Sequence, residues 1–125
     1  MNKSNNKVRH FINYLYSVHD VPRIPIHVHW HSPALVTDQY KFCFGVLFYG
    51  ENCPAEIHVA GKAIKTKGVL STIAHEFVHY LQYLNGRDMD DTEQIEIDAD
   101  LYGAELLENW MRQVKRNASG RSRSW

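Results

Sequence analysis

The stretch from Thr72 to Gln82 reads T-I-A-H-E-F-V-H-Y-L-Q. It contains the pattern H-E-x-x-H, in which His75 and His79 are four residues apart. On a helix these two side chains lie one turn apart on the same face, so both imidazoles can bind a single tetrahedral metal ion. Glu76 is rotated by about 100° from His75, which places its carboxylate beside the metal rather than on it. From there the carboxylate can accept a proton from a metal-bound water.

Apolar residues around this pattern indicate an amphipathic helix. They recur at helical spacing and predict a buried face beside the histidines: Ile73, Phe77, Leu81 and Leu84. We expect the helix to run from about Val69 to Leu84. Asn85-Gly86 then supplies a stop in the left-handed conformation.

Length and composition predict one small domain over residues 1–115. The chain has 125 residues, 44% of them apolar, and 14 basic residues balance 14 acidic ones. This balance gives no general attraction to nucleic acid, and no apolar run is long enough to span a bilayer. We therefore expect neither nucleic acid nor a membrane as a partner, and a cytoplasmic location. In that compartment Cys43 and Cys53 are predicted to be thiols rather than a disulfide.

Before the motif, the pattern predicts one helix and three strands. The helix spans about Val8 to Val18, and a period-two strand spans Ile24 to His31, with Pro25 at its start or on a sheet edge. Phe42 to Tyr49 is almost continuously apolar, which predicts a strand covered on both faces with a bulge at Gly45. Glu56 to Ala60 predicts a shorter strand with Ile57 and Val59 inward.

After the motif, the sequence predicts a third helix. Asp90 and Glu93 fit a capping box at its start, and it ends at about Lys115. Its apolar face is predicted to comprise Ile95, Ala99, Leu101, Tyr102, Leu106, Trp110 and Val114. Residues 116–125 show no periodicity and predict a disordered basic tail. The predicted class is α+β.

The third helix also offers a third metal ligand, which a catalytic zinc site requires. Glu93, Glu96 and Asp100 share one face of the helix. Glu96 is the predicted ligand, and Asp100 is predicted to orient a ligand histidine. Glu93 is better placed as a helix cap, but Glu93 and Asp100 both remain alternative ligands. Three small residues allow this helix to approach the motif helix closely: Ala99, Gly103 and Ala104.

These two segments together resemble a known family. H-E-F-V-H at 75–79 followed by E-I-D-A-D-L-Y-G-A-E-L-L at 96–107 is similar to the ImmA/IrrE-type metallopeptidases, small zincins of the gluzincin plan. The resemblance covers about Ile57 to Leu107. It implies a minimal zincin fold, one zinc ion per chain, and Glu96 as the third zinc ligand. Known members cleave transcriptional repressors, which implies a regulator of a phage or mobile element as the substrate.

The expected function is that of a zinc metallopeptidase acting on a specific protein. His75, His79 and Glu96 would hold zinc, and Glu76 would activate its water and then protonate the leaving amine. We expect the substrate to lie along the strand Glu56–Ala60, taken as an edge. Further candidate stabilisers of the transition state are His58, Tyr49 and Tyr80.

Three alternatives stay open at this stage. The first is a zinc-stabilised protein-binding module without turnover. The second is an SprT-like protease acting on DNA-bound proteins, which would need a third histidine downstream of His79, and none follows it. The third concerns the alternation of His27, His29 and His31 on one strand face. This pattern predicts a face that is exposed to solvent, and a second metal site is the less favoured interpretation.

Overall fold

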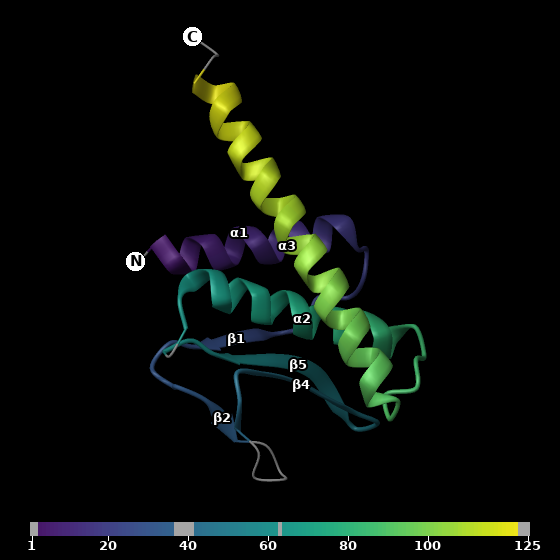
Figure 1. Cartoon of the computed structure of the whole chain (residues 1–125). Coiled ribbons are helices and arrows are strands. Elements are labelled where there is room, and N and C mark those ends of the chain that lie inside the picture. Colours follow the sequence, from purple (N-terminus) through teal and green to yellow (C-terminus); the bar gives the residue numbers. More distant parts are fainter. Residues whose placement is uncertain (1–2, 37–41, 63, 123–125) are drawn as a thin grey trace.

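The protein has an α+β fold in which three helices lie on one side of a small mixed sheet (Figure 1). The computed structural model describes residues 3–36, 42–62 and 64–122. The helices are α1 (Lys3–Val18), α2 (Thr66–Leu84) and α3 (Thr92–Ser122). The strands are β1 (Ile26–His29), β2 (Leu35–Val36), β3 (Phe42–Cys43), β4 (Gly45–Gly50) and β5 (Cys53–Ala60). None of the helices in the described ranges is long and apolar enough to cross a membrane.

The three-stranded sheet has the order β1-β5-β4. β1 runs parallel to β5, and β4 runs antiparallel to it. The prediction that the Glu56–Ala60 segment forms an edge is therefore wrong, because β5 has a partner on each side. The edges are β1 and β4. β1 spans Ile26–His29 rather than the predicted Ile24–His31, so Pro25 precedes the strand, and the edge position agrees with the prediction from this proline. β2 and β3 form a separate two-stranded ladder.

The core lies between the sheet and the helices. Ile57 and Val59 of β5 are fully buried, as predicted, and their partners in the parallel ladder are Ile26 and Val28. The helices contribute further fully buried side chains: Phe11 and Leu15 from α1, Ile73 and Phe77 from α2, and Ala99 from α3. Three residues that were assigned to apolar helix faces are exposed instead: Leu84, Leu101 and Val114. Leu101 follows the buried Ala99 by two residues and therefore projects from the opposite side of α3. Leu84 is the last residue of α2, and Val114 lies beyond Leu106 and Leu107, the last buried residues in the described part of α3.

The helices are longer than the apolar periodicity predicts. α1 begins at Lys3 rather than Val8, and α2 begins at Thr66 rather than Val69. These extra turns carry polar residues, and the hydroxyls of Ser4 and Thr66 lie 2.8 Å apart where the two helices begin. α3 begins at Thr92, so Asp91 rather than Asp90 precedes its first residue, and the predicted capping box is wrong.

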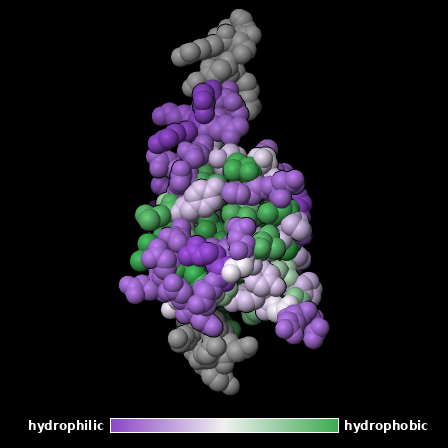
Figure 2. All heavy atoms as spheres, turned by 90° about the vertical axis from the view of Figure 1, so that its right-hand side faces the viewer, coloured by the Kyte–Doolittle hydropathy of each residue, from purple (hydrophilic) through white to green (hydrophobic). Residues whose placement is uncertain are grey.

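α3 also continues beyond its predicted end at Lys115 to Ser122, so residues 116–122 are helical rather than disordered. The remaining predicted tail, residues 123–125, lies outside the described residues. The coloured part of the projecting helix is mostly hydrophilic in Figure 2, whereas hydrophobic residues gather on the body below it. An exposed helix needs no apolar stripe, which explains why periodicity missed this segment.

The apolar segment from Phe42 to Tyr49 is not one strand covered on both faces. It divides into β3 and β4 around Phe44, and the side chains of Phe44, Phe48 and Tyr49 are all exposed. The register irregularity lies between Phe48 and Gly50 rather than at Gly45. Because the helices cover only one face of the sheet, the other face of β4 is exposed to solvent. Cys43 and Cys53 are free thiols, as predicted.

The end of α2 follows its sequence signal. Gly86 has φ = 73°, the left-handed conformation that glycine adopts without a steric cost. Its neighbour Arg87 donates a backbone hydrogen bond to the Gln82 carbonyl at 3.0 Å. This stop turns the chain back, so that α3 can cross α2 and present its acidic face to the motif.

Candidate metal centre

The two helices that carry the site approach each other closely. A Cβ atom placed on Gly103 would lie 3.2 Å from the backbone nitrogen of His75, so a larger side chain would push the helices apart. Ala99 is fully buried in the same contact. The small residues of α3 therefore bring its acidic face to within side-chain reach of the α2 histidines.

Three side chains converge at this crossing. The Nε2 atom of His75 lies 3.0 Å from Glu96 Oε2, and the Nε2 atom of His79 lies 2.9 Å from Glu96 Oε1. The two Nε2 atoms are 3.0 Å apart. A tetrahedral zinc ion with Zn–N distances of about 2.0–2.1 Å holds two ligand nitrogens about 3.3 Å apart. The donor atoms are thus within a few tenths of an ångström of the spacing that zinc requires.

The other ring nitrogens are held by hydrogen bonds. Nδ1 of His75 lies 2.9 Å from the Asp100 carboxylate, which can only accept, so this Nδ1 carries the proton. Nδ1 of His79 lies 2.8 Å from Gln82 Oε1, and Gln82 Nε2 donates to the Ile95 carbonyl at 3.1 Å. The second contact fixes the orientation of the Gln82 amide. Nδ1 of His79 is therefore also the protonated nitrogen.

With both protons on Nδ1, both Nε2 atoms present lone pairs toward each other and toward the Glu96 carboxylate. Such an arrangement is repulsive unless a proton or a cation lies between the donors. A single proton bridges only one pair, whereas a divalent cation attracts all three. Two imidazoles and one carboxylate are a zinc donor set, so the residues present fit this metal.

Glu76 is buried beside the convergent donors. Burial raises the pKa of Glu76 to about 7, and the negative charge of Glu96 adds to the rise. The neighbouring His79 and a hydrogen bond from the Leu47 backbone act in the opposite direction. Glu76 is not one of the three convergent residues, which agrees with its rotation away from the His75–His79 face.

A cleft of about 430 Å³ opens onto these residues. Its walls come from α2, α3 and the segment that enters β4, and it contains Glu76, Glu96 and Gly45. A Cβ atom on Gly45 would lie 2.4 Å from Thr72 Cγ2 and 3.1 Å from Glu76 Cγ. Only glycine lets β4 approach the motif helix this closely, so the cleft depends on it.

Sequence reasoning missed the contributions of Gly45 and Gln82. The close approach of Gly45 to α2 is a tertiary feature that no local pattern encodes. Gln82 did carry a signal, because it follows His79 by three residues and therefore lies on the same side of the helix. Cys43 also lines the cleft, and burial raises the pKa of its thiol.

The three further candidates for transition-state stabilisation lie away from the cleft. His58 is on the opposite face of the sheet, where its Nε2 lies 2.6 Å from Glu56 Oε1. The Tyr80 hydroxyl donates to the Pro22 carbonyl at 2.7 Å, and the Tyr49 ring packs on Tyr83 with centroids 4.7 Å apart. None of the three lines the cleft, so the structure does not bring them to the convergent residues. Strand and helix periodicity separates two faces without saying which one meets the cleft.

Of the acidic residues considered as ligands, Glu96 and Asp100 reach the histidines. Glu93 lies in the first turn of α3 and outside the convergent group.

No protein family, curated protein or solved structure matches this chain. The function is therefore inferred from the geometry of the site.

Replacing Asp100 by Ala is expected to weaken zinc binding by about 10–100-fold, the usual effect of removing a partner that orients a ligand histidine. Asp98→Ala is the matched control, because Asp98 is on the same helix but bonds to Arg87 and Gln94. Zinc affinity is measured by competition with a chromophoric chelator. Equal affinities for the two variants would refute a role for Asp100 in orienting His75.

Proposed function

We propose that this chain is a zinc-dependent metallopeptidase with a minimal zincin-like fold, of the kind implied by its resemblance to the ImmA/IrrE-type enzymes. The observation that carries the proposal is the convergence of His75, His79 and Glu96 at 2.9–3.0 Å. Glu76 is buried beside them and lines one cleft together with His75 and Glu96. A metal site that only holds the fold together has no need of an additional carboxyl group at the metal or of an open cleft.

When bound, zinc supplies a water ligand of lowered pKa and polarises the carbonyl of the scissile bond. Glu76 accepts the proton from the attacking water and delivers it to the leaving amine. Its position supports this role, because the Glu76 side chain is buried beside the three convergent residues without being one of them. Asp100 and Gln82 keep the two imidazoles oriented throughout.

The proposed substrate path follows β4 instead of β5. In the described residues β4 has no strand on its other side, and it enters the cleft at Gly45. The Ala60 amide donates to the Phe44 carbonyl at 2.8 Å, so in this antiparallel pair the Gly45 and Leu47 amides point away from β5. The Leu47 amide donates to Glu76, so the Gly45 amide is the one of the two that is offered to a peptide. An extended peptide added to this edge would pass over the convergent residues.

We further propose that the substrate is a specific protein, with a regulator of a phage or mobile element as the class that the resemblance implies. The cleft of about 430 Å³ supports this proposal, because it has room for few side-chain pockets. Recognition would then depend on the strand added to β4 and on surfaces outside the cleft.

The proposed activity is tested by incubating the zinc-loaded protein with native proteins and with peptides prepared from a whole cell extract. Mass spectrometry then identifies new chain ends. We expect a small set of cleavages that EDTA suppresses and that added zinc restores. A zinc-loaded protein that generates no new chain ends in either pool would contradict the peptidase proposal.

The β4 path makes a separate prediction. When a cleaved peptide is bound to the inactive Glu76→Gln variant, amide hydrogen exchange is expected to slow in β4 and to stay unchanged in β1. β1 is the matched control because it is the other edge of the same sheet. Protection of β1 instead, or of neither edge, would exclude strand addition at β4.

A further inference from the structure

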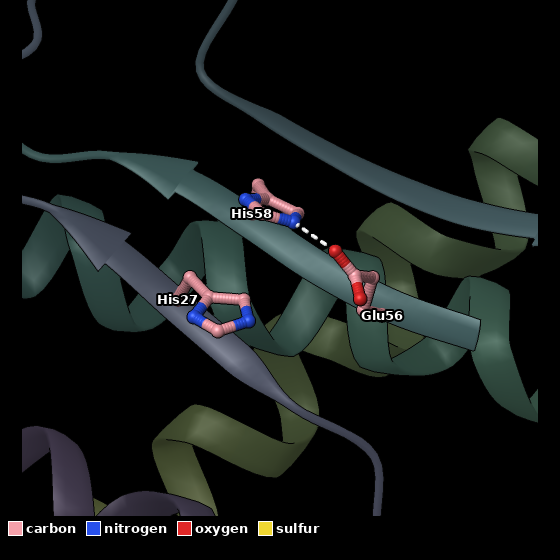
Figure 3. Close-up of side chains that lie close together, drawn as sticks. All are labelled: His27, Glu56 and His58. Atoms are coloured by element: carbon pink, nitrogen blue, oxygen red, sulfur yellow. Dashed lines mark hydrogen bonds and ion pairs between the residues drawn. The ribbon is translucent and has the colours of Figure 1, made fainter. Parts of the chain in front are cut away.

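A second group of metal-binding side chains lies on the face of the sheet opposite the helices. In the parallel ladder His27 of β1 is the partner of His58 of β5. Glu56 precedes His58 by two residues and therefore projects from the same face. Figure 3 shows the three side chains on one side of the two strands, with the helices behind. Ile57 and Val59 point the other way, into the core.

These side chains are close enough to share one ion. Each of His27, Glu56 and His58 offers one ligand atom, and the three atoms lie within 4.8 Å of one another. His58 Nε2 is 2.6 Å from Glu56 Oε1, and the His27 and His58 rings stack with centroids 4.7 Å apart. A small movement of exposed side chains would bring all three atoms to about 2.0–2.2 Å from a common zinc ion.

His29 is hydrogen-bonded to Nδ1 of His58, the ring nitrogen that does not face Glu56. His29 Nε2 lies 2.8 Å from His58 Nδ1, and the two rings are parallel within 10° with centroids 5.1 Å apart. Without a metal, His58 Nε2 carries the proton toward the Glu56 carboxylate, and His58 Nδ1 accepts from His29 Nε2. A cation bound at Nε2 would replace that proton, and a proton on His58 Nδ1 would then point to His29 Nε2. This is the arrangement in which a second residue orients a ligand histidine.

A divalent cation suits this group better than a proton does. A proton on His58 Nε2 bridges only the pair that His58 forms with Glu56, whereas a divalent cation attracts every donor in the group.

We propose that His27, Glu56 and His58 form a second binding site for a divalent transition-metal ion, with zinc as the best match to two imidazoles and one carboxylate. His29 is a positioning residue. His27 is exposed, which leaves a fourth coordination position open to water. The ion would tie the four-residue edge strand β1 to the central strand β5. The site differs from the predicted alternation of three histidines on one strand, because its members come from two strands.

The test titrates full-length protein with zinc chloride and counts bound zinc by calorimetry and elemental analysis. The Glu96→Ala variant serves as the background, because its substitution affects only the first site. In this background, His27→Gln and His58→Gln are each expected to remove one equivalent of zinc. His10→Gln, a substitution of an exposed histidine on α1, is expected to remove none. His29→Gln is expected to weaken the same equivalent by about 10–100-fold.

Thermal unfolding provides the second readout. Zinc is expected to raise the melting temperature of Glu96→Ala and of its His10→Gln derivative, but not that of its His27→Gln derivative. Because His27 is exposed, its replacement is expected to leave the metal-free melting temperature unchanged. The proposal is overturned if His27→Gln and His58→Gln bind as much zinc as His10→Gln. It is also overturned if zinc raises the melting temperatures of Glu96→Ala and of its His10→Gln and His27→Gln derivatives equally.

Discussion

Replacing Glu76 by Gln is expected to abolish peptide hydrolysis while the protein keeps its zinc. The amide has nearly the same shape as the carboxyl group, so it fits the buried position against Gly45. It cannot take the proton from the attacking water, and losing a general base lowers turnover by about 10²–10⁴-fold. Zinc affinity should change little, because Glu76 lies outside the convergent group of His75, His79 and Glu96.

The measurement is kcat/KM on a cleaved peptide, with zinc content determined on the same samples. Glu105→Gln is the matched control, since it makes the same chemical change at an exposed site on α3. This experiment also separates the proposed enzyme from a zinc-stabilised binding module. If the zinc-loaded wild-type protein and Glu76→Gln bound a partner equally and neither cleaved it, the binding module would be the correct interpretation.

Replacing Glu96 by Ala is expected to lower zinc affinity at the first site by more than about 100-fold, because a three-ligand site would retain only two histidines. The Glu96 side chain is 55% exposed, so its loss should leave the fold intact. His79→Ala is expected to have the same effect on zinc but to destabilise the protein as well. The His79 side chain is buried, and its loss would leave the buried Gln82 Oε1 atom without the donor it has in His79 Nδ1.

Glu93→Ala is the control for this prediction, because Glu93 is the alternative ligand one turn earlier on the same helix. Affinity is measured in the His58→Gln background, which removes the proposed second site from the count. If Glu93→Ala lost the zinc and Glu96→Ala retained it, the third ligand would be misassigned. Retention in both variants would exclude Glu93 and Glu96 and leave Asp100 as the alternative ligand on α3.

The part of the site that depends on local spacing could be predicted from the sequence. The four-residue interval between His75 and His79 and the four-residue interval between Glu96 and Asp100 fix which side chains share a helix face. The small residue at Gly103 further indicated a close crossing of the two helices. The structure brings these four side chains together as that spacing requires.

The order of the strands could not be predicted in the same way. Alternation placed Ile57 and Val59 in the core, but burial of one face says nothing about which strands lie on either side. β5 therefore was assigned as an edge although it is central. The same limit misplaced His58. It also concealed the pairing of His27 with His58, which depends on the register between two strands whose partner residues are 31 apart in sequence.

The exposed parts of the helices were missed for a different reason. Apolar periodicity reports contact with the core, and the first turns of α1 and the end of α3 make little such contact. Their extent follows from continuous backbone hydrogen bonding, which leaves no hydrophobic pattern in the sequence. The role of Gly45 could not be predicted either, because it depends on how close the folded chain brings Gly45 to Glu76 and Thr72.

Anomalous X-ray scattering from zinc-soaked crystals, measured on both sides of the zinc absorption edge, tests the central claim most directly. We expect a peak about 2.0–2.2 Å from His75 Nε2, His79 Nε2 and a Glu96 carboxylate oxygen, with Glu76 outside bonding distance of the ion. A second peak is expected among His27, Glu56 and His58. Absence of a peak between His75, His79 and Glu96 in zinc-saturated crystals would contradict the proposed metallopeptidase site.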